Sequence, residues 1–372
     1  MKFTFSQNVM EKGLQQVVGT ISARMPMPSL SNLHLRLNDK ILEITSTDLE
    51  VTTTAFVELI DSEGSGGVLI PAKRFQDIVR ELPDIPLELD VPEPGKIYLQ
   101  GDFQGRYTLP GGDPMDFPEL PPVDKKTVFE IEAGLFKRMI TKTLFAVSHD
   151  EMRPVLTGLF LRVRTGSLTV VATDGHRLSR ITREGIDYGG NSVDVIVPMK
   201  ALNLIQRTIE DEETLEIALA ETRASFRTEK FALITRLIDG RYPNYESVIP
   251  TENPGNLLVR TSDFMSAIRR VHIFASQLSH QVLLHLEPTL MDMKSEDQEI
   301  GSEAKESLEI SYEGQPMDIA YNGNYLMDVL RQIDTEETVF EMSTHEDAAV
   351  IHPTSQQNNE NFLMLLMPIR LR

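Results

Sequence analysis

One short polar stretch in the middle of the chain contains residue types that could do acid–base chemistry. Asp174, His176 and Arg177 lie within four residues of one another, and a carboxylate near an imidazole can serve proton transfer. The same stretch also fits a β-hairpin, because Asp174-Gly175 is a strong turn signal. We favour a hairpin whose polar side chains hold the turn. An enzyme that uses these three residues stays open as the rival interpretation.

Sequence signals for other chemistry are missing. The chain has no Gly-Lys-Ser/Thr phosphate loop and no His-Glu-x-x-His motif. It has no cysteine, which excludes disulfides, zinc–thiolate sites and thiol catalysis. The eight histidines lack metal-ligand spacing, since His280 and His285 are five residues apart and do not share a helical face. We expect no metal and no cofactor.

The sequence also gives no sign of a membrane segment. The opening residues 1–7 have no apolar signal-peptide core. The longest notable apolar run, 362–367, is far shorter than the roughly 20 residues that span a bilayer. The lack of cysteine fits a reducing compartment. We predict a cytoplasmic protein without membrane contact.

The elements that must position these residues recur three times along the chain. At 195–198 an apolar run meets a proline and leads into a helical pattern, and the same happens at 68–71. Pro71 and Pro198 are 127 residues apart, and Asn322 takes the proline's place 124 residues further on. Such self-similarity marks a repeated structural unit. We predict three similar domains, at 1–125, 126–253 and 254–372.

Each predicted domain contains several short strands and two helices. The predicted helices cover 7–24, 73–82, 134–147, 199–209, 263–275 and 323–333. Ser6 is the expected N-cap of the first helix, and strands at 168–172 and 177–182 flank the Asp174 turn. The run 362–367 fits a final buried strand, and the acidic stretch 295–306 fits a solvated loop. Helices layered on antiparallel sheets make an α+β fold.

Charge is sorted between the helices and the rest of the chain. The formal net charge is −20, from 36 basic and 56 acidic residues. The six predicted helices hold 13 of the basic residues and only 5 of the acidic ones. Helix propensity alone does not explain this bias, because helices favour Glu as well as Lys and Arg. A positive set of helices on an acidic protein indicates a specific anionic partner.

Several separated motifs resemble one known family, the bacterial sliding clamp, which is the β subunit of the replicative DNA polymerase. Residues 172–178, Ala-Thr-Asp-Gly-His-Arg-Leu, resemble a clamp hairpin. Residues 239–245, Asp-Gly-Arg-Tyr-Pro-Asn-Tyr, resemble a second clamp segment, and the ending at 367–371 resembles the clamp tail. The resemblance runs end to end and covers all three predicted domains.

The resemblance implies a closed head-to-tail homodimer, with six similar domains around a hole that takes duplex DNA. Helices would line the hole and contact phosphates without reading sequence. The cations expected to face DNA are Arg24, Arg80, Lys137, Lys142, Lys200, Arg207, Arg269 and Arg270.

The resemblance also implies a pocket for short peptides of the polymerase III catalytic subunit, the clamp loader and other clamp-binding proteins. Its expected residues are Leu156, Thr173, Gly175, His176, Arg177, Leu178, Pro243, Val248, Leu365, Met367, Pro368, Ile369, Arg370 and Leu371. Apolar side chains would supply contact area, and Arg would supply oriented donors. Ile369 departs from the Met that is usual in the family's tail.

Further residues are implied for the dimer interface. One side carries Arg74, Arg106, Tyr107 and Leu109, and the other carries Ile273, Phe274, Glu303 and Glu306. Arg74 and Arg106 would face the acids. Besides the enzyme, a scaffold that keeps the clamp fold but has lost DNA binding stays open as an alternative. A processivity assay separates the scaffold from a working clamp.

Overall fold

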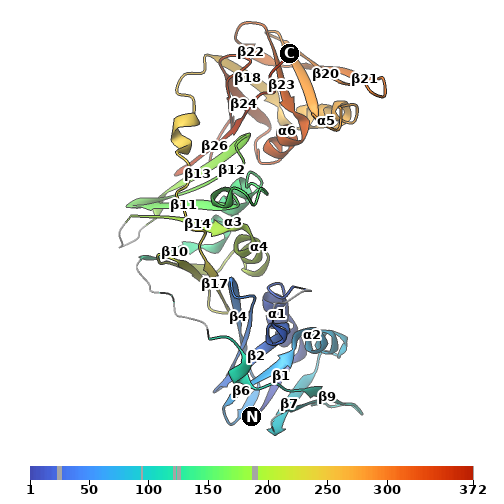
Figure 1. The fold of residues 1–372 in the computed structure, drawn as a ribbon, viewed down its shortest axis with the longest axis vertical. Coiled ribbons are helices and arrows are strands. Elements are labelled where there is room, and N and C mark those ends of the chain that lie inside the picture. Colours follow the sequence, from blue (N-terminus) through green and yellow to red (C-terminus); the bar gives the residue numbers. More distant parts are fainter. Residues whose placement is uncertain (23–26, 94, 120–122, 124–126, 187–191, 372) are drawn as a thin grey trace. The chain divides into compact units, whose positions relative to one another are not determined.

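The fold is known from a computed structural model that describes residues 1–22, 27–93, 95–119, 123, 127–186 and 192–371 (Figure 1). Each predicted domain begins with a strand that runs directly into a helix: β1 into α1, β10 into α3, and β18 into α5. A second strand–helix pair follows in each case. The repeat seen in the sequence is therefore a repeat of secondary structure.

The first predicted domain contains nine strands and two helices among its described residues. The helices are α1 (Gln7–Val18) and α2 (Ala72–Glu81). The strands are β1 (Lys2–Ser6), β2 (Asn32–Asn38), β3 (Ile41–Thr47), β4 (Val51–Glu58), β5 (Asp61–Glu63), β6 (Gly66–Pro71), β7 (Pro86–Glu93), β8 (Lys96–Gly101) and β9 (Arg106–Pro110).

The middle predicted domain has the helices α3 (Ala133–Leu144) and α4 (Met199–Thr208) and a short 3-10 turn, η3 (Pro154–Leu156). Its strands are β10 (Thr127–Glu132), β11 (Gly158–Arg164), β12 (Gly166–Thr173), β13 (Arg177–Ile186), β14 (Val193–Pro198), β15 (Thr214–Leu219), β16 (Arg223–Arg227) and β17 (Phe231–Arg236). A second 3-10 turn, η4 (Tyr245–Val248), follows.

The last predicted domain has the helices α5 (Thr261–His272) and α6 (Gly323–Leu330). Its strands are β18 (Gly255–Arg260), β19 (Gln281–Leu286), β20 (Leu290–Asp297), β21 (Ser302–Glu309), β22 (Ser311–Glu313), β23 (Met317–Asn322), β24 (Glu337–Met342), β25 (Ala349–Pro353) and β26 (Glu360–Leu366).

The repeated strand-to-helix turn is built from residues that suit a helix start. Pro71 and Pro198 stand at the N-caps of α2 and α4 with φ near −60°, which is the value that the proline ring imposes. Asn322 has the same place before α6, where its side chain accepts hydrogen bonds from the backbone N–H groups of Asn324 and Tyr325. The proline ring thus sets the backbone at the helix start in two copies, and the Asn322 side chain caps the helix in the third.

The chain divides into two compact units that cut across the predicted domains. The first unit holds Met1–Lys137 and Asp187–Ile238, and the second holds Arg138–Ile186 and Asp239–Arg372. This division follows the sheets, because each unit contains a sheet that joins strands from two predicted domains.

In the first unit, an eight-stranded sheet runs β10-β15-β16-β17-β4-β3-β2-β6. The first and middle domains meet in it where β17 pairs with β4, for example Leu233 opposite Thr53. A separate five-stranded sheet runs β5-β1-β7-β8-β9 and ends on β9. Both sheets are antiparallel throughout, as the α+β prediction requires.

In the second unit, strands pair in the order β11-β12-β13-β26-β25-β24-β18-β22. The middle and last domains meet where β13 pairs with β26, over seven residue pairs from Arg177–Leu366 to Arg183–Glu360. A four-stranded sheet runs β21-β20-β19-β23, with β21 at one edge. The C-terminal tail continues from β26 past β23, where Ile369 forms a bridge with Ala320.

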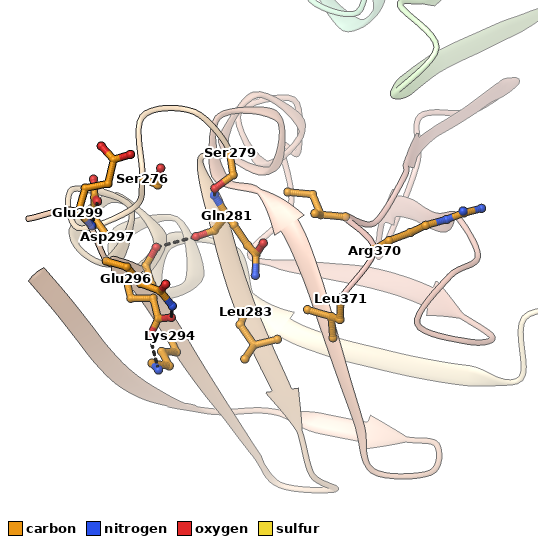
Figure 2. A pocket seen from close by; sticks show the side chains of 13 residues that line it. Ser276, Ser279, Gln281, Leu283, Lys294, Glu296, Asp297, Glu299, Arg370 and Leu371 are labelled. Carbon is orange, nitrogen blue, oxygen red and sulfur yellow. Dashed lines mark hydrogen bonds and ion pairs between the residues drawn. The ribbon is translucent and has the colours of Figure 1, made fainter. Parts of the chain in front are cut away.

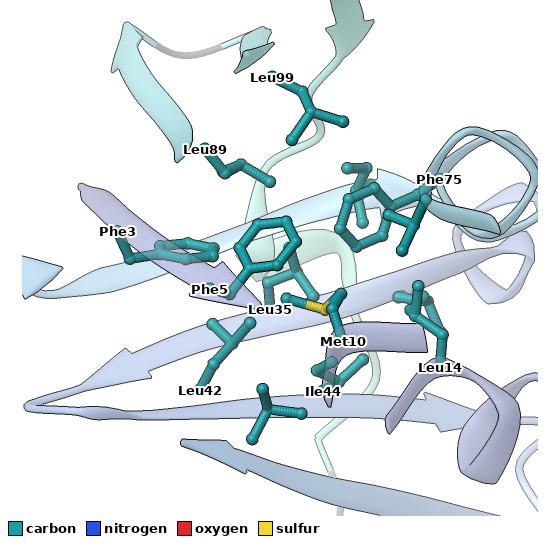
Figure 3. Packing of buried hydrophobic residues seen from close by; sticks show 14 of the residues in the cluster. Phe3, Phe5, Met10, Leu14, Leu35, Leu42, Ile44, Phe75, Leu89 and Leu99 are labelled. Atoms are coloured by element: carbon teal, nitrogen blue, oxygen red, sulfur yellow. The ribbon is translucent and has the colours of Figure 1, made fainter. Parts of the chain in front are cut away.

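Each domain's core is made by alternating strand residues and one face of its helices. In the first domain Phe3 and Phe5 of β1 meet Met10 and Leu14 of α1, and Phe75 of α2 closes the cluster (Figure 3). All five side chains are buried. Burying each of these side chains stabilises the fold by about 1.5–3 kcal/mol. Because the buried positions must be apolar, the spacing of apolar residues in the sequence predicts the strand and the two helices.

Three details differ from the sequence-based expectations. The acidic stretch 295–306 is not a loop: it forms the ends of β20 and β21 and the turn between them, with Glu296 opposite Glu303. Its outward side chains are charged because that face of the sheet meets water. These charges obscure the alternation of apolar and polar residues that marks a strand in a sequence. The side chain of Ser6 makes no capping hydrogen bond, and α1 ends at Val18. The strands around the Asp174 turn and the final strand β26 are confirmed.

Candidate functional site

The hairpin between β12 and β13 is held by its own polar side chains. One carboxylate oxygen of Asp174 accepts the backbone N–H groups of His176 (2.9 Å) and Arg177 (3.0 Å), and the other accepts Nε of Arg177 (3.1 Å). Gly175 has φ +93°, a conformation that only glycine adopts easily. The Asp174 carboxylate is therefore fully used in the turn, as the hairpin interpretation predicts.

Arg177 ties this hairpin to helix α6. Its side chain is 9% exposed, and Nη1 donates to Asp328 at 2.5 Å. The guanidinium lies 4.4 Å above the centre of the Tyr325 ring, and the His176 ring stacks on that tyrosine at 6.0 Å. Tyr325 and Asp328 belong to the site, but the linear sequence did not single them out. Their only signal is a shared helix face three residues apart.

The C-terminal tail lies directly beside the hairpin. Leu178 of β13 stands opposite Leu365 of β26, and both are buried. The tail then leaves the sheet, with Met367 N–H donating to His176 O (2.9 Å) and Ile369 N–H donating to Ala320 O (2.7 Å). The structure thus brings the tail against a hairpin that lies about 190 positions earlier in the sequence. The side chains of Met367 and Leu371 stay 44% and 38% exposed.

The third part of the predicted pocket is the segment around Pro243. Tyr242 stacks on Phe160 of β11 with ring centres 4.7 Å apart, and Tyr245 contacts the same ring edge-on at 6.0 Å. These contacts fix Pro243, which is exposed, and Val248 of η4, which is 55% exposed. Leu156 of η3 is buried, just ahead of β11. Exposed apolar side chains thus border a rigid support, which suits a binding surface.

The predicted pocket residues therefore divide into supports and contacts. Buried supports are Leu156, Arg177, Leu178 and Leu365, and Thr173 holds the turn by donating its hydroxyl to Arg177 O (2.7 Å). Exposed or half-exposed residues are Gly175, His176, Pro243, Val248, Met367, Pro368, Ile369, Arg370 and Leu371.

The helix cations predicted to face DNA differ in how free they are. Arg207 on α4 and Arg269 on α5 are exposed and form no ion pair within the described part of the chain. Arg80 on α2 is exposed and pairs with Asp77 (3.2 Å) and Glu81 (3.4 Å). These contacts are weak, because solvent screens them.

Two further cations are held by neighbouring elements. Lys137 on α3 contacts Asp211 (2.5 Å) and Ile209 O (2.9 Å). Lys200 on α4 contacts Asp48 and Thr20 O. Arg24 lies outside the described residues.

Lys142 differs from the expectation of an exposed cation. Its side chain is buried, and its ammonium donates to Asp334 (2.7 Å) and to Gln332 O. Arg138, one turn earlier on α3, contacts Asp334 (2.7 Å) and the buried carboxylate of Glu360 (2.9 Å). Burial lowers the pKa of Lys142 despite the carboxylate beside it. This cluster joins α3 to the end of the last domain, so the positive charge of Lys142 serves the fold.

The predicted dimer residues lie on exposed edges, with one exception. Ile273 is 76% and Phe274 39% exposed, just after α5. Tyr107 is half-buried on the edge strand β9, and the Arg106 guanidinium covers the Tyr98 ring at 4.0 Å. Leu109 is 7% exposed and packs into the core of the first domain instead. Arg74 is exposed on α2.

The two acids predicted to face a second copy already have partners within the chain. Glu306 of β21 pairs with Arg270 of α5 at 2.6 Å, and Glu303 pairs with Lys305 (3.1 Å) and Lys294 (3.4 Å). The Arg270 guanidinium lowers the pKa of Glu306. Since these pairs are exposed, they can exchange partners at little cost.

Within residues 1–22, 27–93, 95–119, 123, 127–186 and 192–371, no group of His, Asp and Glu side chains could hold a metal ion. Over the same residues, no helix is long and apolar enough to cross a lipid bilayer.

Profiles of one family match nearly the whole chain in three consecutive pieces. They are the N-terminal domain of the DNA polymerase III beta subunit at residues 1–121, its central domain at 130–244, and its C-terminal domain at 246–370. The order and number of the pieces agree with the threefold repeat of strand–helix pairs.

Full-length relatives agree with these matches. The beta sliding clamp of Pseudomonas aeruginosa is 31% identical over 373 residues, and that of Bacillus subtilis is 27% identical over 381 residues, each with 100% of both chains covered. A crystal structure of the Pseudomonas aeruginosa subunit superimposes with a TM-score of 0.94 at 30% identity, covering 100% of both chains. The Thermotoga maritima subunit has the same fold, with a TM-score of 0.90 at 24% identity.

These matches decide between the two interpretations of the Asp174 hairpin. The relatives are clamps, so the hairpin belongs to a binding protein, and the enzyme interpretation is wrong. The chain belongs to the family of the β subunit of DNA polymerase III, the β sliding clamps, which are non-catalytic processivity subunits.

Proposed function

We propose that two copies of the chain close head to tail into a ring of six domains, with domain boundaries at 1–125, 126–253 and 254–372. Several described strands lie at sheet edges, and the observation that carries this proposal is that the edge strands β9 and β21 carry the predicted dimer residues Arg106, Tyr107, Glu303 and Glu306. Among the described strands, β9 and β21 each have a neighbour on one side only. An edge strand presents unpaired N–H and C=O groups that can extend a sheet. Two different edges on one chain suit a contact that repeats head to tail.

Side chains beside these two edges support the same contact. Ile273 and Phe274 are large apolar residues exposed after α5, which packs against β20 and β21. At the other edge Tyr107 packs against Phe103, with ring centres 6.1 Å apart, and Arg106 adds positive charge. Glu303 and Glu306 on β21 add negative charge. Apolar centres with complementary charges at the rim are typical of specific interfaces.

We propose that duplex DNA passes through this ring and contacts its helices. The family implies DNA and polymerase partners. Exposed cations at Arg80, Arg207 and Arg269 support phosphate contact, and Lys137 and Lys200 can add to it by leaving their surface carboxylates. Phosphate contacts carry no sequence information. The proposed contact is therefore independent of DNA sequence.

We propose that partner proteins dock at the hairpin–tail surface. These partners are the polymerase III catalytic subunit, the clamp loader and other proteins that carry a clamp-binding motif. Buried Leu178 and Leu365 hold the surface, and exposed Val248 and Met367 offer contact area. A clamp of this family, that of Pseudomonas aeruginosa, has been crystallised bound to griselimycin, which supports a ligand site on such proteins. The proposed location is the cytoplasm, where this polymerase works.

A processivity assay tests the proposal directly. The chain is added with its own polymerase and clamp loader to primed circular DNA, and the length of the products is measured. We expect long products only when the chain and the loader are both present, since a ring must be opened to enter circular DNA. Linearising the DNA should release the loaded protein. A dimer that leaves product length unchanged would instead be a scaffold without DNA function.

A further inference from the structure

A cavity of about 530 Å³ lies beside the C-terminal tail in the last domain. Its volume is in the range of about 300–1,000 Å³ that is usual for ligand sites. Its lining includes Gln281 and Leu283 of β19, Lys294 of β20, and Ile369 and Leu371 of the tail. Figure 2 shows Leu371 of the tail beside Leu283. None of the pocket residues predicted from the sequence lies here except those of the tail.

The tail and the sheet hold this cavity open. Ile369 N–H donates to Ala320 O at 2.7 Å, which attaches the tail to the edge strand β23. Within the sheet, Ser295 donates its hydroxyl to Gln281 O at 2.6 Å and fixes β20 against β19. At the rim, Ser276 and Ser279 are too small to fill the space. The tail is therefore held by a backbone hydrogen bond, and β20 is held to β19 by the buried side chain of Ser295.

The charges that face the cavity leave negative charge without a partner. Lys294 is occupied by Glu296 (2.6 Å) and Glu303 (3.4 Å). Asp297 and Glu299, which also line the cavity, form no ion pair among the described residues. Figure 2 shows the Arg370 guanidinium extended away from these acids. Asp297 and Glu299 thus lack a cationic partner among the described residues, because Lys294 is paired with other acids.

Apolar surface lies next to these acids. Leu371 is 38% exposed and Leu283 is half-buried, and both line the cavity. Lysine and arginine have an aliphatic stem and a charged end, so they can cover apolar surface and still reach a carboxylate. The cavity's chemistry therefore matches one such side chain.

The same tail borders the cavity and the proposed peptide-binding surface. Met367 contacts the His176 hairpin, and Leu371 lines the cavity. Four residues of extended chain span about 13 Å, so a short flank of a docked peptide can pass from one to the other. We propose that the cavity is a second subsite, which takes a lysine or arginine from the segment flanking the docked partner peptide. This proposal rests on the peptide-binding function proposed above.

Calorimetry with matched peptides tests the second subsite. The core peptide has Gln followed by spaced Leu and Phe, and further versions carry four extra residues at either end, with one Lys or one Glu. On the intact protein we expect one Lys extension to bind about three- to tenfold tighter than the core peptide, which corresponds to an ion pair plus buried stem. The matching Glu extension should bind no tighter than the core.

Two variants test whether the affinity gained from the Lys extension depends on the acids of the cavity. The double variant Asp297→Asn, Glu299→Gln should lose the Lys gain and keep the affinity for the core peptide. Asn preserves the acceptor that Asp297 offers to Glu299 N–H at 3.0 Å, so the turn should keep its shape. Glu309→Gln on β21 removes an exposed acid from outside the cavity and should keep the gain. Thermal melting and sedimentation confirm that both variants fold and dimerise.

The outcomes separate this proposal from the one on which it rests. If the core peptide binds but Lys and Glu extensions bind equally, or the double variant keeps the Lys gain, the second subsite is wrong. If the core peptide itself fails to bind, the hairpin–tail surface is not the docking site and both proposals fail.

Discussion

Arg270 and Glu306 form a two-pronged ion pair, with Nε 2.7 Å from one carboxylate oxygen and Nη2 2.6 Å from the other. The pair joins α5 to the edge strand β21. From the sequence, Arg270 was predicted to contact DNA and Glu306 to contact a second copy. In the single chain they satisfy each other, so each role requires the pair to open. Because both side chains face solvent, which screens their attraction, opening the pair costs little.

Removing the carboxylate should therefore shift Arg270 toward DNA. We expect Glu306→Gln to strengthen binding to linear duplex DNA about twofold to fivefold at low salt, since the freed guanidinium gains a phosphate. The same change should weaken the dimer if Glu306 also faces a second copy. Filter binding and sedimentation measure the two effects. Glu309→Gln, on the same strand, serves as the control, and an identical DNA affinity in both variants would contradict this account.

Neutralising a free helix cation should act weakly and without regard to DNA sequence. For Arg207→Gln or Arg269→Gln we expect the slope of log affinity against log salt to fall by about one unit. Lys40→Gln removes an exposed cation from the turn between β2 and β3 and should leave the slope unchanged. A clear preference for particular sequences, or complete loss of binding from one substitution, would count against the sliding contact.

Loss of two exposed apolar side chains should separate the copies. In Ile273→Ala, Phe274→Ala each truncation removes apolar area that a second copy would bury, at about 1.5–3 kcal/mol per side chain. We expect a monomer in sedimentation at micromolar concentration. The melting temperature of the monomer should change little, because both residues are already exposed in the chain. Met152→Ala, which truncates another exposed side chain, should stay dimeric, and a dimeric double variant would refute the pairing.

Shortening the tail should remove partner binding and keep the fold. A protein ending at Leu366 retains all of β26 but loses Met367 and the backbone bond to His176. We expect the core peptide to lose at least tenfold in affinity by calorimetry, since such interfaces depend on a few anchors. Ile369→Met should widen the range of accepted peptides, because Met is less stiff than a β-branched side chain. Unchanged affinity for the core peptide in the shortened protein would contradict the assignment of the hairpin–tail surface as the docking site.

The cluster around Asp334 should make stability depend on pH. Burial raises the pKa of Asp334, but hydrogen bonds from Lys142 and Arg138 outweigh it, and the net pKa lies below the usual 3.8. A lowered folded pKa means stability that is present above the unfolded pKa and lost as pH falls through the folded one. We expect urea stability to drop below about pH 4.

The variant Asp334→Asn should remove part of this dependence and cost about 1–3 kcal/mol at pH 7, because the Lys142 ammonium loses a charged partner. Asp347→Asn, at another exposed aspartate, should change neither quantity by more than about 0.5 kcal/mol. Denaturation curves from pH 3 to pH 7 measure both. If Asp334→Asn and the unaltered protein are equally stable at pH 7, the Asp334 carboxylate does not stabilise the buried Lys142 ammonium.

Elements with a strong apolar period were predictable from the sequence, and so was their repetition. Phe75 and Val79 mark the buried face of α2, and Leu202 and Ile205 mark that of α4, because helical spacing places such residues on one side. The stretch 295–306 was not predictable, since its strand alternates between charged and small polar residues. Sequence composition there reports exposure and says little about backbone conformation.

Long-range contacts set the limit for predicting the site. The Asp174 turn follows from local chemistry, and the hairpin was expected for that reason. The pairing of β13 with β26 and the stack of Tyr325 on His176 join distant segments, which no local pattern encodes. Lys142 shows the same limit. A lysine on a helix is predicted to be exposed, and only the position of Asp334 explains why Lys142 is buried.

The pairing of β17 with β4 has a consequence for the newborn chain. Leu233 stands opposite Thr53 in this ladder, so β4 leaves the ribosome long before its neighbour has been made. At about 5–20 residues per second, the edge of β4 waits on the order of ten to thirty-five seconds. Unpaired strand edges are templates for the wrong neighbour. The time between synthesis of these two strands is thus a period in which the chain is open to misassembly and in which a chaperone can protect it.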